Sequence, residues 1–300
     1  YVQVPAELKR LGVLKFNGHF DGYLRDFNAF GQLQTGLGSA SLDMHMVQPA
    51  KGLPYYEGSL DLKKFQAGAL TGNQLGLGMV SASGEIRGEG FSGEDFFAAF
   101  DGGVSLLEIN GYTYQGRVVN ADVGPGVFTG RVLVDDPNAK LDFNGRIDFS
   151  QEKPSFDFIA RLREVDLGRL NVIALDSSSS LSTNIYINAS GDEPDNIMGS
   201  LRVDNTRFSL GSREYQMDEL TLSSELLPEG KTLSLHSDFI DADVDGQYRF
   251  VPLFQHLGNQ LAAINPSSGL ERIEILDSLP QNFTFSVHLK ETAALTDLFV

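Results

Sequence analysis

The sequence predicts an all-β protein built from antiparallel strands, each with one apolar and one polar face. Three observations lead to this fold class. Apolar and polar residues alternate with a period of two over most of the chain. The alternating segments are separated by short stretches rich in Gly, Asn, Asp and Pro. Segments with helical periodicity are scarce.

The alternation is clearest in AKLDFNGRIDFS, residues 139–150, where apolar side chains occupy every second position. Strands with one solvent-exposed polar face and one apolar face are typical of antiparallel sheets, because parallel sheets are usually covered on both faces. The apolar members of this segment and of six similar ones are the candidates for the lining of an apolar groove. They are Leu141, Phe143, Ile147, Phe149, Phe156, Phe158, Leu181, Ile185, Ile187, Leu201, Val203, Leu220, Leu222, Leu233, Leu235, Phe283, Phe285 and Val287.

The stretches between strands have the composition of turns. Examples are DVGPGV, VDDPNAK, QEKPS and LPEGK. This composition therefore predicts a hairpin around DDPN, with strands at residues 127–134 and 139–149. Because Asp and Pro suit turn positions, Asp135 and Asp136 are interpreted as turn residues and not as a catalytic carboxylate pair.

Three segments are candidates for short helices. Residues 251–264 place apolar side chains on one side and a proline near the first turn, so this segment could cap the sheet edges or plug the mouth of a groove. Residues 93–101 could form a short helix, and residues 293–300 begin like one.

Composition excludes several function classes. The net charge of -17 argues against nucleic acid binding and against electrostatic docking to anionic lipid headgroups, so any lipid contact would be apolar. The chain has no cysteine, which rules out disulfides and thiolate zinc sites. No apolar run is long enough to span a bilayer, and we expect the chain to be an internal segment of a longer protein.

One stretch resembles the start of a calcium-binding loop. DADVDG, residues 241–246, has aspartates at the first, third and fifth positions and glycine at the sixth, but the twelfth position is Pro252 instead of a bidentate glutamate. The same stretch keeps strand alternation, and we interpret it as the solvated face of a strand that begins after a bulge or turn near Phe239. A weak calcium site formed by Asp241, Asp243 and Asp245 is the alternative. No cofactor is expected.

The chain also contains an internal repeat. LKKFQAGAL at residues 62–70 aligns with LREVDLGRL at residues 162–170, with Gly68 and Gly168 in equivalent positions. We therefore divide the segment 1–300 into approximate sub-repeats 16–115 and 116–250, followed by a helix-containing end, 251–300, with a further strand.

Several phrases together resemble the TamB group of AsmA-like envelope proteins, the inner-membrane components of the translocation and assembly module, in the form found in Bacteroidetes-type bacteria. They are FNGHFDGYLRDFNAFGQLQTGLGSASLDM, FQAGALTGNQLGLGMVSASGEIRGEG, INGYTYQGRVVNADVGPGVFTGRVLVDDPNAKLDFNGRIDFS and LSLHSDFIDADVDGQYRF. The resemblance runs from about Phe16 to Leu257, and it rests on the order and spacing of these phrases.

The resemblance implies a β-taco, an elongated antiparallel sheet folded into a U-shaped groove with an apolar interior. It implies a periplasmic location, tethering to the inner membrane by an anchor outside this chain, and an outer-membrane barrel partner of the BamA/TamA type. The family function is to carry phospholipid between the two membranes and so support outer-membrane biogenesis. Because the family has no catalytic motif, a non-enzymatic protein is expected.

Three other functions fit parts of the pattern. A scaffold for outer-membrane barrel assembly or protein secretion would act by β-augmentation and would depend on a free edge strand. A polysaccharide-binding or polysaccharide-cleaving solenoid would need exposed aromatic side chains beside clustered carboxylates, whereas here the aromatic residues fall mainly on the apolar positions. A structural spacer would have a closed, tightly packed interior.

Overall fold

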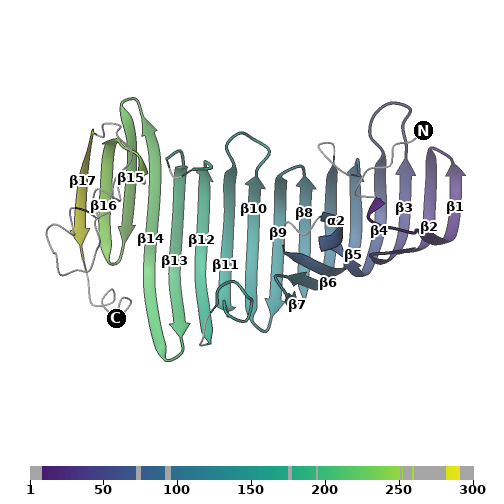
Figure 1. Ribbon diagram of the computed structural model, residues 1–300, viewed down its shortest axis with the longest axis horizontal. Helices are drawn as coiled ribbons and strands as arrows, with labels where there is room; N and C mark the ends of the chain where they lie inside the picture. The colour runs from purple at the N-terminus through teal and green to yellow at the C-terminus, as the bar shows by residue number, and fades with distance from the viewer. Residues whose placement is uncertain are drawn as a thin grey trace. The chain divides into compact units, whose positions relative to one another are not determined.

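The computed structural model confirms the all-β class: the strands belong to one 17-stranded antiparallel sheet that does not close on itself (Figure 1). The structure describes residues 9–71, 76–91, 96–174, 178–193, 195–250, 252, 259 and 282–290. Within them, the only helix with defined bounds is α2, Ala67–Thr71.

The strands are 3 to 15 residues long. The first nine are β1 (Lys15–Tyr23), β2 (Asp26–Thr35), β3 (Gly38–Val47), β4 (Tyr55–Gln66), β5 (Leu77–Glu89), β6 (Phe97–Ile109), β7 (Tyr112–Tyr114), β8 (Arg117–Gly124) and β9 (Val127–Asp136). The others are β10 (Ala139–Asp148), β11 (Ser155–Val165), β12 (Ser179–Ser190), β13 (Met198–Leu210), β14 (Arg213–Leu227), β15 (Gly230–Ser237), β16 (Ile240–Gln247) and β17 (Asn282–Leu289).

Strands that follow one another in the chain are neighbours in the sheet. The registers from β1 to β6, from β8 to β10 and from β14 to β17 are all antiparallel. The exception is the short β7, because β6 pairs with both β7 and β8. The hairpin expected around DDPN is confirmed, since Leu141 of β10 lies opposite Val134 of β9. The turn expected near Phe239 is also confirmed, between β15 and β16.

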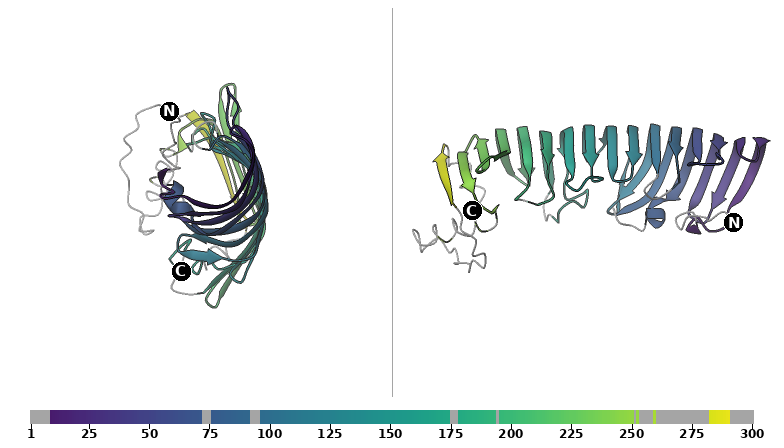
Figure 2. Two further views of the ribbon diagram at one scale, coloured as in Figure 1. Left: turned by 90° about the vertical axis from the view of Figure 1, so that its right-hand side faces the viewer. Right: turned by 90° about the horizontal axis from the view of Figure 1, so that it is seen from above.

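The chain forms two compact units. Unit 1 comprises Tyr1–Ser150, Phe158–Asn184 and Arg207–Glu214, and unit 2 comprises Gln151–Asp157, Ile185–Thr206 and Tyr215–Val300. In unit 1 the strands are curved along their length, so that one face of the sheet is concave; the curvature is plain at β1 to β5, purple to blue in Figure 2.

Glycines on the concave face of unit 1 permit this curvature. Gly84 lies directly opposite Gly102, and similar pairs occur at two other places in the unit. Gly58 of β4 has a φ of 142°, and a Cβ there would overlap the carbonyl oxygen of Asp43 on β3. Only glycine therefore allows the two backbones to approach this closely.

A buried carboxylate organises the turn between β9 and β10. Asp136, 3% exposed, accepts hydrogen bonds from the Tyr112 hydroxyl (2.5 Å) and from the backbone amides of Gln115 and Asn138 (both 2.9 Å). The Asn138 side chain donates to the same Tyr112 hydroxyl at 2.9 Å. These contacts confirm the turn interpretation of this residue, while its neighbour Asp135 is exposed.

The repeat at an offset of 100 residues has a structural counterpart in unit 1. Lys64 and Glu164 both have positive φ angles, 47° and 52°. Each donates its backbone amide to a serine hydroxyl on the following strand, Ser81 at 2.9 Å and Ser182 at 3.0 Å. Both bends are followed by a helical or turn segment, which is α2 in the first copy. Both segments thus end at the same kind of bend, with a positive φ angle and a backbone amide that donates to a serine hydroxyl.

One predicted helix is wrong. Phe97–Ile109 forms β6, whereas residues 93–101 were expected to be helical. Ala98, Phe100 and Val104 alternate on one face of β6, which pairs with β5 and β8, so sheet pairing outweighs the helical propensity of the alanines. The helices expected at 251–264 and 293–300 lie outside the described residues, except for Pro252 and Asn259, both helical. The further strand expected after residue 251 is β17.

Replacing Asp136 by alanine is expected to destabilise unit 1 by about 1–3 kcal/mol, because it leaves a half-buried hydroxyl and two amides without their acceptor. Asp135→Ala is the matched control and should change the unfolding free energy by less than about 0.5 kcal/mol, since this side chain is exposed. Urea unfolding followed by circular dichroism measures both. Equal effects of the two substitutions would contradict the organising role of Asp136.

Gly58→Ala is expected to lower the unfolding free energy by about 1–3 kcal/mol through backbone strain and overlap with β3. Gly124→Ala is the control, because the nearest atom to its added Cβ, the Phe96 oxygen, would be 3.7 Å away. The same urea titration distinguishes them. A tolerated alanine at position 58 would show that the close approach of β3 and β4 is not needed for folding.

Candidate functional site: an apolar sheet face

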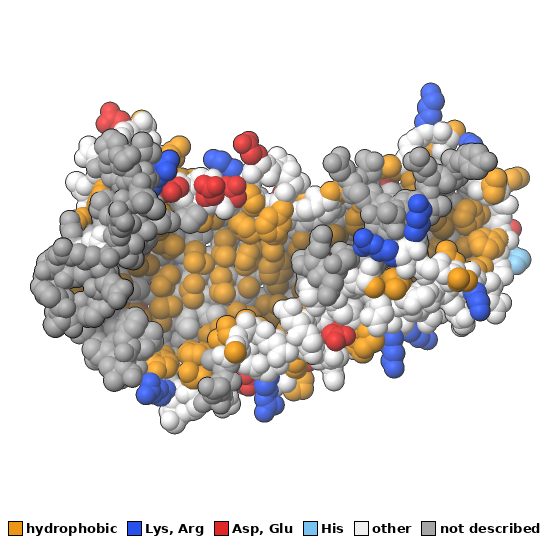
Figure 3. All heavy atoms as spheres, in the orientation of Figure 1, with side chains coloured by type: hydrophobic (Ala, Val, Ile, Leu, Met, Phe, Trp, Pro, Cys, Tyr) orange, Lys and Arg blue, Asp and Glu red, His pale blue; other side chains and the backbone are white. Residues whose placement is uncertain are grey.

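The sheet register gathers apolar side chains on one face. In unit 1, Leu42 lies opposite Leu60, and Met46 lies opposite Tyr56. Further along the unit, Phe143 lies opposite Val132. Figure 3 shows hydrophobic side chains, in orange, gathered on the face of β10 and β11 that is turned toward the viewer. In unit 1 this apolar face is the concave one.

Aromatic side chains form a row across three strands of unit 1. The ring centroids of Phe128 and Phe143 are 5.8 Å apart, and those of Phe143 and Phe158 are 5.1 Å apart. The rings are tilted with respect to one another, at 59° and 39°. Contacts of this kind stabilise the pairing of strands β9, β10 and β11. They also give the face a continuous apolar surface.

Among the described residues, the large side chains of the apolar face are only half-buried. Leu141, Phe143, Ile147 and Phe158 all have intermediate exposure. The fully buried hydrophobic residues of the whole described chain are mostly small, with six alanines among them. A face packed beneath a second layer would instead bury its large side chains, as cores of folded domains do. Within the described residues, the face of unit 1 is therefore largely open.

One rim of unit 1 is covered locally. Ala139, Val165 and Leu170 form a small buried cluster. Tyr112 and Tyr114 of β7 pack against this cluster, and so do Leu162, Leu167 and Leu181. The groove candidate Leu181 thus belongs to a small closed core at the rim and is not part of the open floor.

Unit 2 has its own buried cluster. Val244 and Tyr248 are its buried members, and Leu233, Phe250 and Phe283 pack against them. Beside it lies an apolar hollow of about 120 Å³, to which Leu201, Leu222 and Leu233 contribute side chains. Of the groove candidates in unit 2, Leu233 and Phe283 therefore pack in this cluster, and Leu201 and Leu222 lie beside it at the hollow.

The remaining candidates of unit 2 differ in exposure. Phe285 and Val287 of β17 are 51% and 53% exposed. The others with intermediate exposure are Phe156, Ile185, Ile187, Val203, Leu220 and Leu235. In unit 1, Phe149 lies one residue beyond the end of β10 and is 59% exposed, so the structure places it at the rim and not on the floor.

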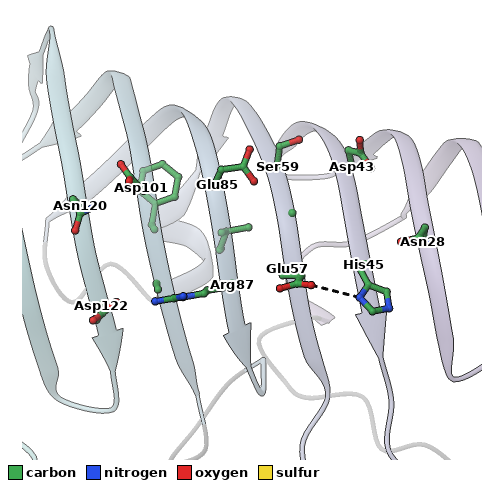
Figure 4. Close-up of a pocket in the computed structure, with 14 residues that line it drawn as sticks. Asn28, Asp43, His45, Glu57, Ser59, Glu85, Arg87, Asp101, Asn120 and Asp122 are labelled. Atoms are coloured by element: carbon green, nitrogen blue, oxygen red, sulfur yellow. Dashed lines mark ion pairs between the residues drawn. The ribbon is translucent and has the colours of Figure 1, made fainter.

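The opposite face of unit 1 is polar. Figure 4 shows the polar side chains on this face of β2 to β8, with His45 between Asn28 and Glu57 on neighbouring strands. His45 Nε2 is 2.9 Å from Asp26, and its Nδ1 is 3.7 Å from Glu57. The hydrogen bond with Asp26 is the main reason that the pKa of His45 is raised, and Glu57 adds to the effect.

Ion pairs continue along this polar face. Arg131 makes two hydrogen bonds with Asp142, at 3.0 and 3.2 Å, and Arg161 lies 3.7 Å from the same carboxylate. Lys140 and Glu164 are 2.6 Å apart. These pairs are exposed, and exposed ion pairs contribute little stability each. We therefore expect them to act mainly on solubility and on the register between strands.

The aspartates of the calcium-like stretch lie on strand β16, which confirms the strand interpretation. Asp241 is 2.6 Å from Lys290, and the hydrogen bond from this lysine is the main reason that the pKa of Asp241 is lowered. Positions two apart on an extended strand are separated by roughly 6.6 Å, too far for the close ligand set of a calcium loop. Among the described residues, no group of three or more potential metal ligands comes together.

Sequence reasoning missed one polar group on the apolar face of unit 2. Lys231 shares the strand parity of Leu233 and Leu235 on β15 and is only 8% exposed. Its Nζ donates to Oδ1 of Asp195 at 2.9 Å. The sequence contains a signal for this buried lysine, because in KTLSLHS the lysine occupies the same alternating positions as the two leucines.

Comparison of the chain with protein-family models, with curated proteins and with solved structures finds no significant match. Among the described residues, the structure has no helix that could cross a membrane.

The open face predicts binding of an apolar fluorescent dye such as N-phenylnaphthylamine. Phe158→Gln should weaken the dye affinity about fivefold, because it removes on the order of 1 kcal/mol of apolar contact from the aromatic row. Asp157→Gln on the opposite face is the control and should leave the affinity unchanged. Fluorescence titration of the folded variants measures both, and an unchanged affinity in Phe158→Gln would show that the dye binds elsewhere.

Proposed function

We propose that this chain is a segment of a periplasmic bridge-like protein whose apolar face carries phospholipid between the inner and outer membranes and so supports outer-membrane biogenesis. The observation that carries the proposal is the open apolar face of the sheet. Its large side chains are half-buried among the described residues, and its strands curve around it in unit 1. Contiguous apolar surfaces of this kind mark binding sites for apolar ligands or partners.

The chemistry of this face suits acyl chains. Each methylene transferred from water to an apolar surface contributes about 0.8 kcal/mol, so a chain of several methylenes binds without any specific contact. In unit 1 the floor consists of Phe, Leu, Ile, Val, Ala, Met and Tyr side chains on neighbouring strands, with glycines between them. A floor with few polar groups offers similar contacts at successive positions, which favours sliding of a bound chain over fixed binding.

The resemblance to the TamB group supports the cellular setting of this proposal. It suggests tethering to the inner membrane by an anchor outside this chain, and an outer-membrane barrel partner of the BamA/TamA type. The chain's net charge of -17 fits an apolar mode of lipid contact, because anionic headgroups are not attracted to an acidic protein. No catalytic step is needed for this function.

The test is site-specific photo-crosslinking in a bacterial envelope. A photoreactive amino acid is placed at Phe143, Phe158 or Val203 on the apolar face, and after irradiation mass spectrometry identifies covalently attached phospholipid. Adducts are expected at all three positions. Asp142, Asp157 and Arg202, each adjacent in sequence on the opposite face, serve as matched controls and should give none.

Two results would overturn the proposal. Adducts on both faces would mean non-selective contact with membranes. Absence of lipid adducts at every position in a folded protein, with protein adducts in their place, would favour the scaffold function by β-augmentation.

A further inference from the structure

Unit 2 contains a partly buried ion pair beside its apolar hollow, in which the lysine is buried and the aspartate is half-buried. Lys231 Nζ donates to Oδ1 of Asp195 at 2.9 Å and to its backbone oxygen at 3.0 Å. The same ammonium lies 4.7 Å from the centroid of the Tyr248 ring and 5.7 Å from that of Phe250. A buried ion pair is often no more stable than an apolar replacement, so folding alone does not explain a lysine at this position.

Tyr248 is the second unusual group. It is 7% exposed, and its hydroxyl has no hydrogen-bond partner among the described residues. Burial raises the pKa of Tyr248 to about 12, and the nearby carboxylates of Asp245 and Asp195 add to the effect. The hydroxyl therefore stays protonated near neutral pH and can donate a hydrogen bond. A buried donor without an acceptor destabilises a fold unless a ligand supplies one.

Phe250 joins the ion pair to the hollow. Its ring lies beneath the Lys231 ammonium, its backbone amide donates to Asp195 at 2.6 Å, and its side chain lines the hollow together with Leu201 and Leu233. The apolar hollow and the charged pair thus share one wall. The carboxylate of Asp195 is itself 35% exposed, so the pair is accessible from one side.

This arrangement matches the junction between the acyl chains and the headgroup of a zwitterionic glycerophospholipid. The hollow suits part of an acyl chain. The ammonium of Lys231 and the hydroxyl of Tyr248 suit a phosphate oxygen, and the carboxylate of Asp195 suits the ammonium of the lipid. An uncharged lipid would leave the two charged groups paired only with each other, and a lipid with only a negative headgroup would compete with the carboxylate for the ammonium.

We infer that Lys231, Asp195 and Tyr248 form a headgroup site for a zwitterionic phospholipid at the rim of the apolar face of unit 2. The inference rests on the proposed lipid-carrying function and adds a position at which the lipid is held in a defined orientation. Elsewhere on the face acyl chains slide, whereas here the headgroup is recognised.

The test compares two short-chain lipids that differ in their headgroup, dihexanoyl phosphatidylethanolamine and dihexanoylglycerol. Their affinities for the purified chain are measured by isothermal titration below the concentration at which either lipid aggregates. The wild-type chain should prefer the phospholipid. Tyr248→Phe should reduce that preference about fivefold, the size expected for one buried hydrogen bond.

Tyr248→Phe removes only the unpartnered hydroxyl, so its thermal stability without lipid should be unchanged or raised. Tyr186→Phe is the matched control: this ring stacks on Arg202 at 4.4 Å, and its strand position is on the polar parity of β12. The control should keep the full preference. Lys231→Met should abolish the preference while retaining dihexanoylglycerol binding.

Three outcomes decide the inference. Loss of the headgroup preference in Tyr248→Phe, with stability retained, supports it. An unchanged preference in Tyr248→Phe and Lys231→Met overturns the headgroup site but leaves lipid carriage intact, provided that both lipids still bind. Failure of the wild-type chain to bind either lipid overturns the headgroup site and the proposed function together.

Discussion

The antiparallel register between neighbouring strands is the constraint on which the other features depend. Successive side chains of a strand point to opposite faces, so a slip of one residue would exchange the two faces of that strand. The registers of unit 1 keep Leu42, Leu60 and Met46 on the apolar face and Asp43, Glu57 and Glu85 on the other. Where the register shifts, between Leu62 and Phe65, the positive φ of Lys64 accommodates the bulge. The separation of the apolar face from the polar face thus follows from the geometry of strand pairing.

Stability in such a sheet comes from contacts that differ from those of a globular core. Large side chains on the apolar face contact their cross-strand neighbours, as in the row Phe128, Phe143 and Phe158, and remain half-exposed on the side away from the sheet. Buried polar clusters such as that around Asp136 hold the turns. The acidic opposite face opposes association of exposed strands from different molecules. These features allow a sheet to keep an apolar face available for a ligand.

The sequence was sufficient for the fold class because the period of two recurs in nearly every segment. The DDPN hairpin, the turn near Phe239 and the strand at residues 240–247 were predictable for the same reason. The helix expected at residues 93–101 was wrong because local propensity carries no information about the strands that pair with β6.

The site could be predicted only in part. Alternation assigns residues to a face, and the groove candidates were found in this way. It does not show which of them lie beneath a local cover, as Leu181 does, or beyond the end of a strand, as Phe149 does. The cluster of Lys231, Asp195 and Tyr248 joins three segments of unit 2, and the approach of Asp195 depends on how the connection between β12 and β13 folds. Contacts of this kind become visible only when the chain is placed in three dimensions.

The pairing of strands in chain order has a consequence for how the protein is made. Each new strand of a hairpin docks on the strand synthesised just before it, so the loop that must close is short and its entropic cost is low. Up to β16, folding can therefore advance one strand at a time from the first part of the chain to emerge from a ribosome or a secretion channel, without waiting for distant partners. At each moment the growing edge is the most recent strand, and its natural partner is the next segment of the same chain. Local topology thus guides the nascent sheet toward its own continuation and away from pairing with other molecules.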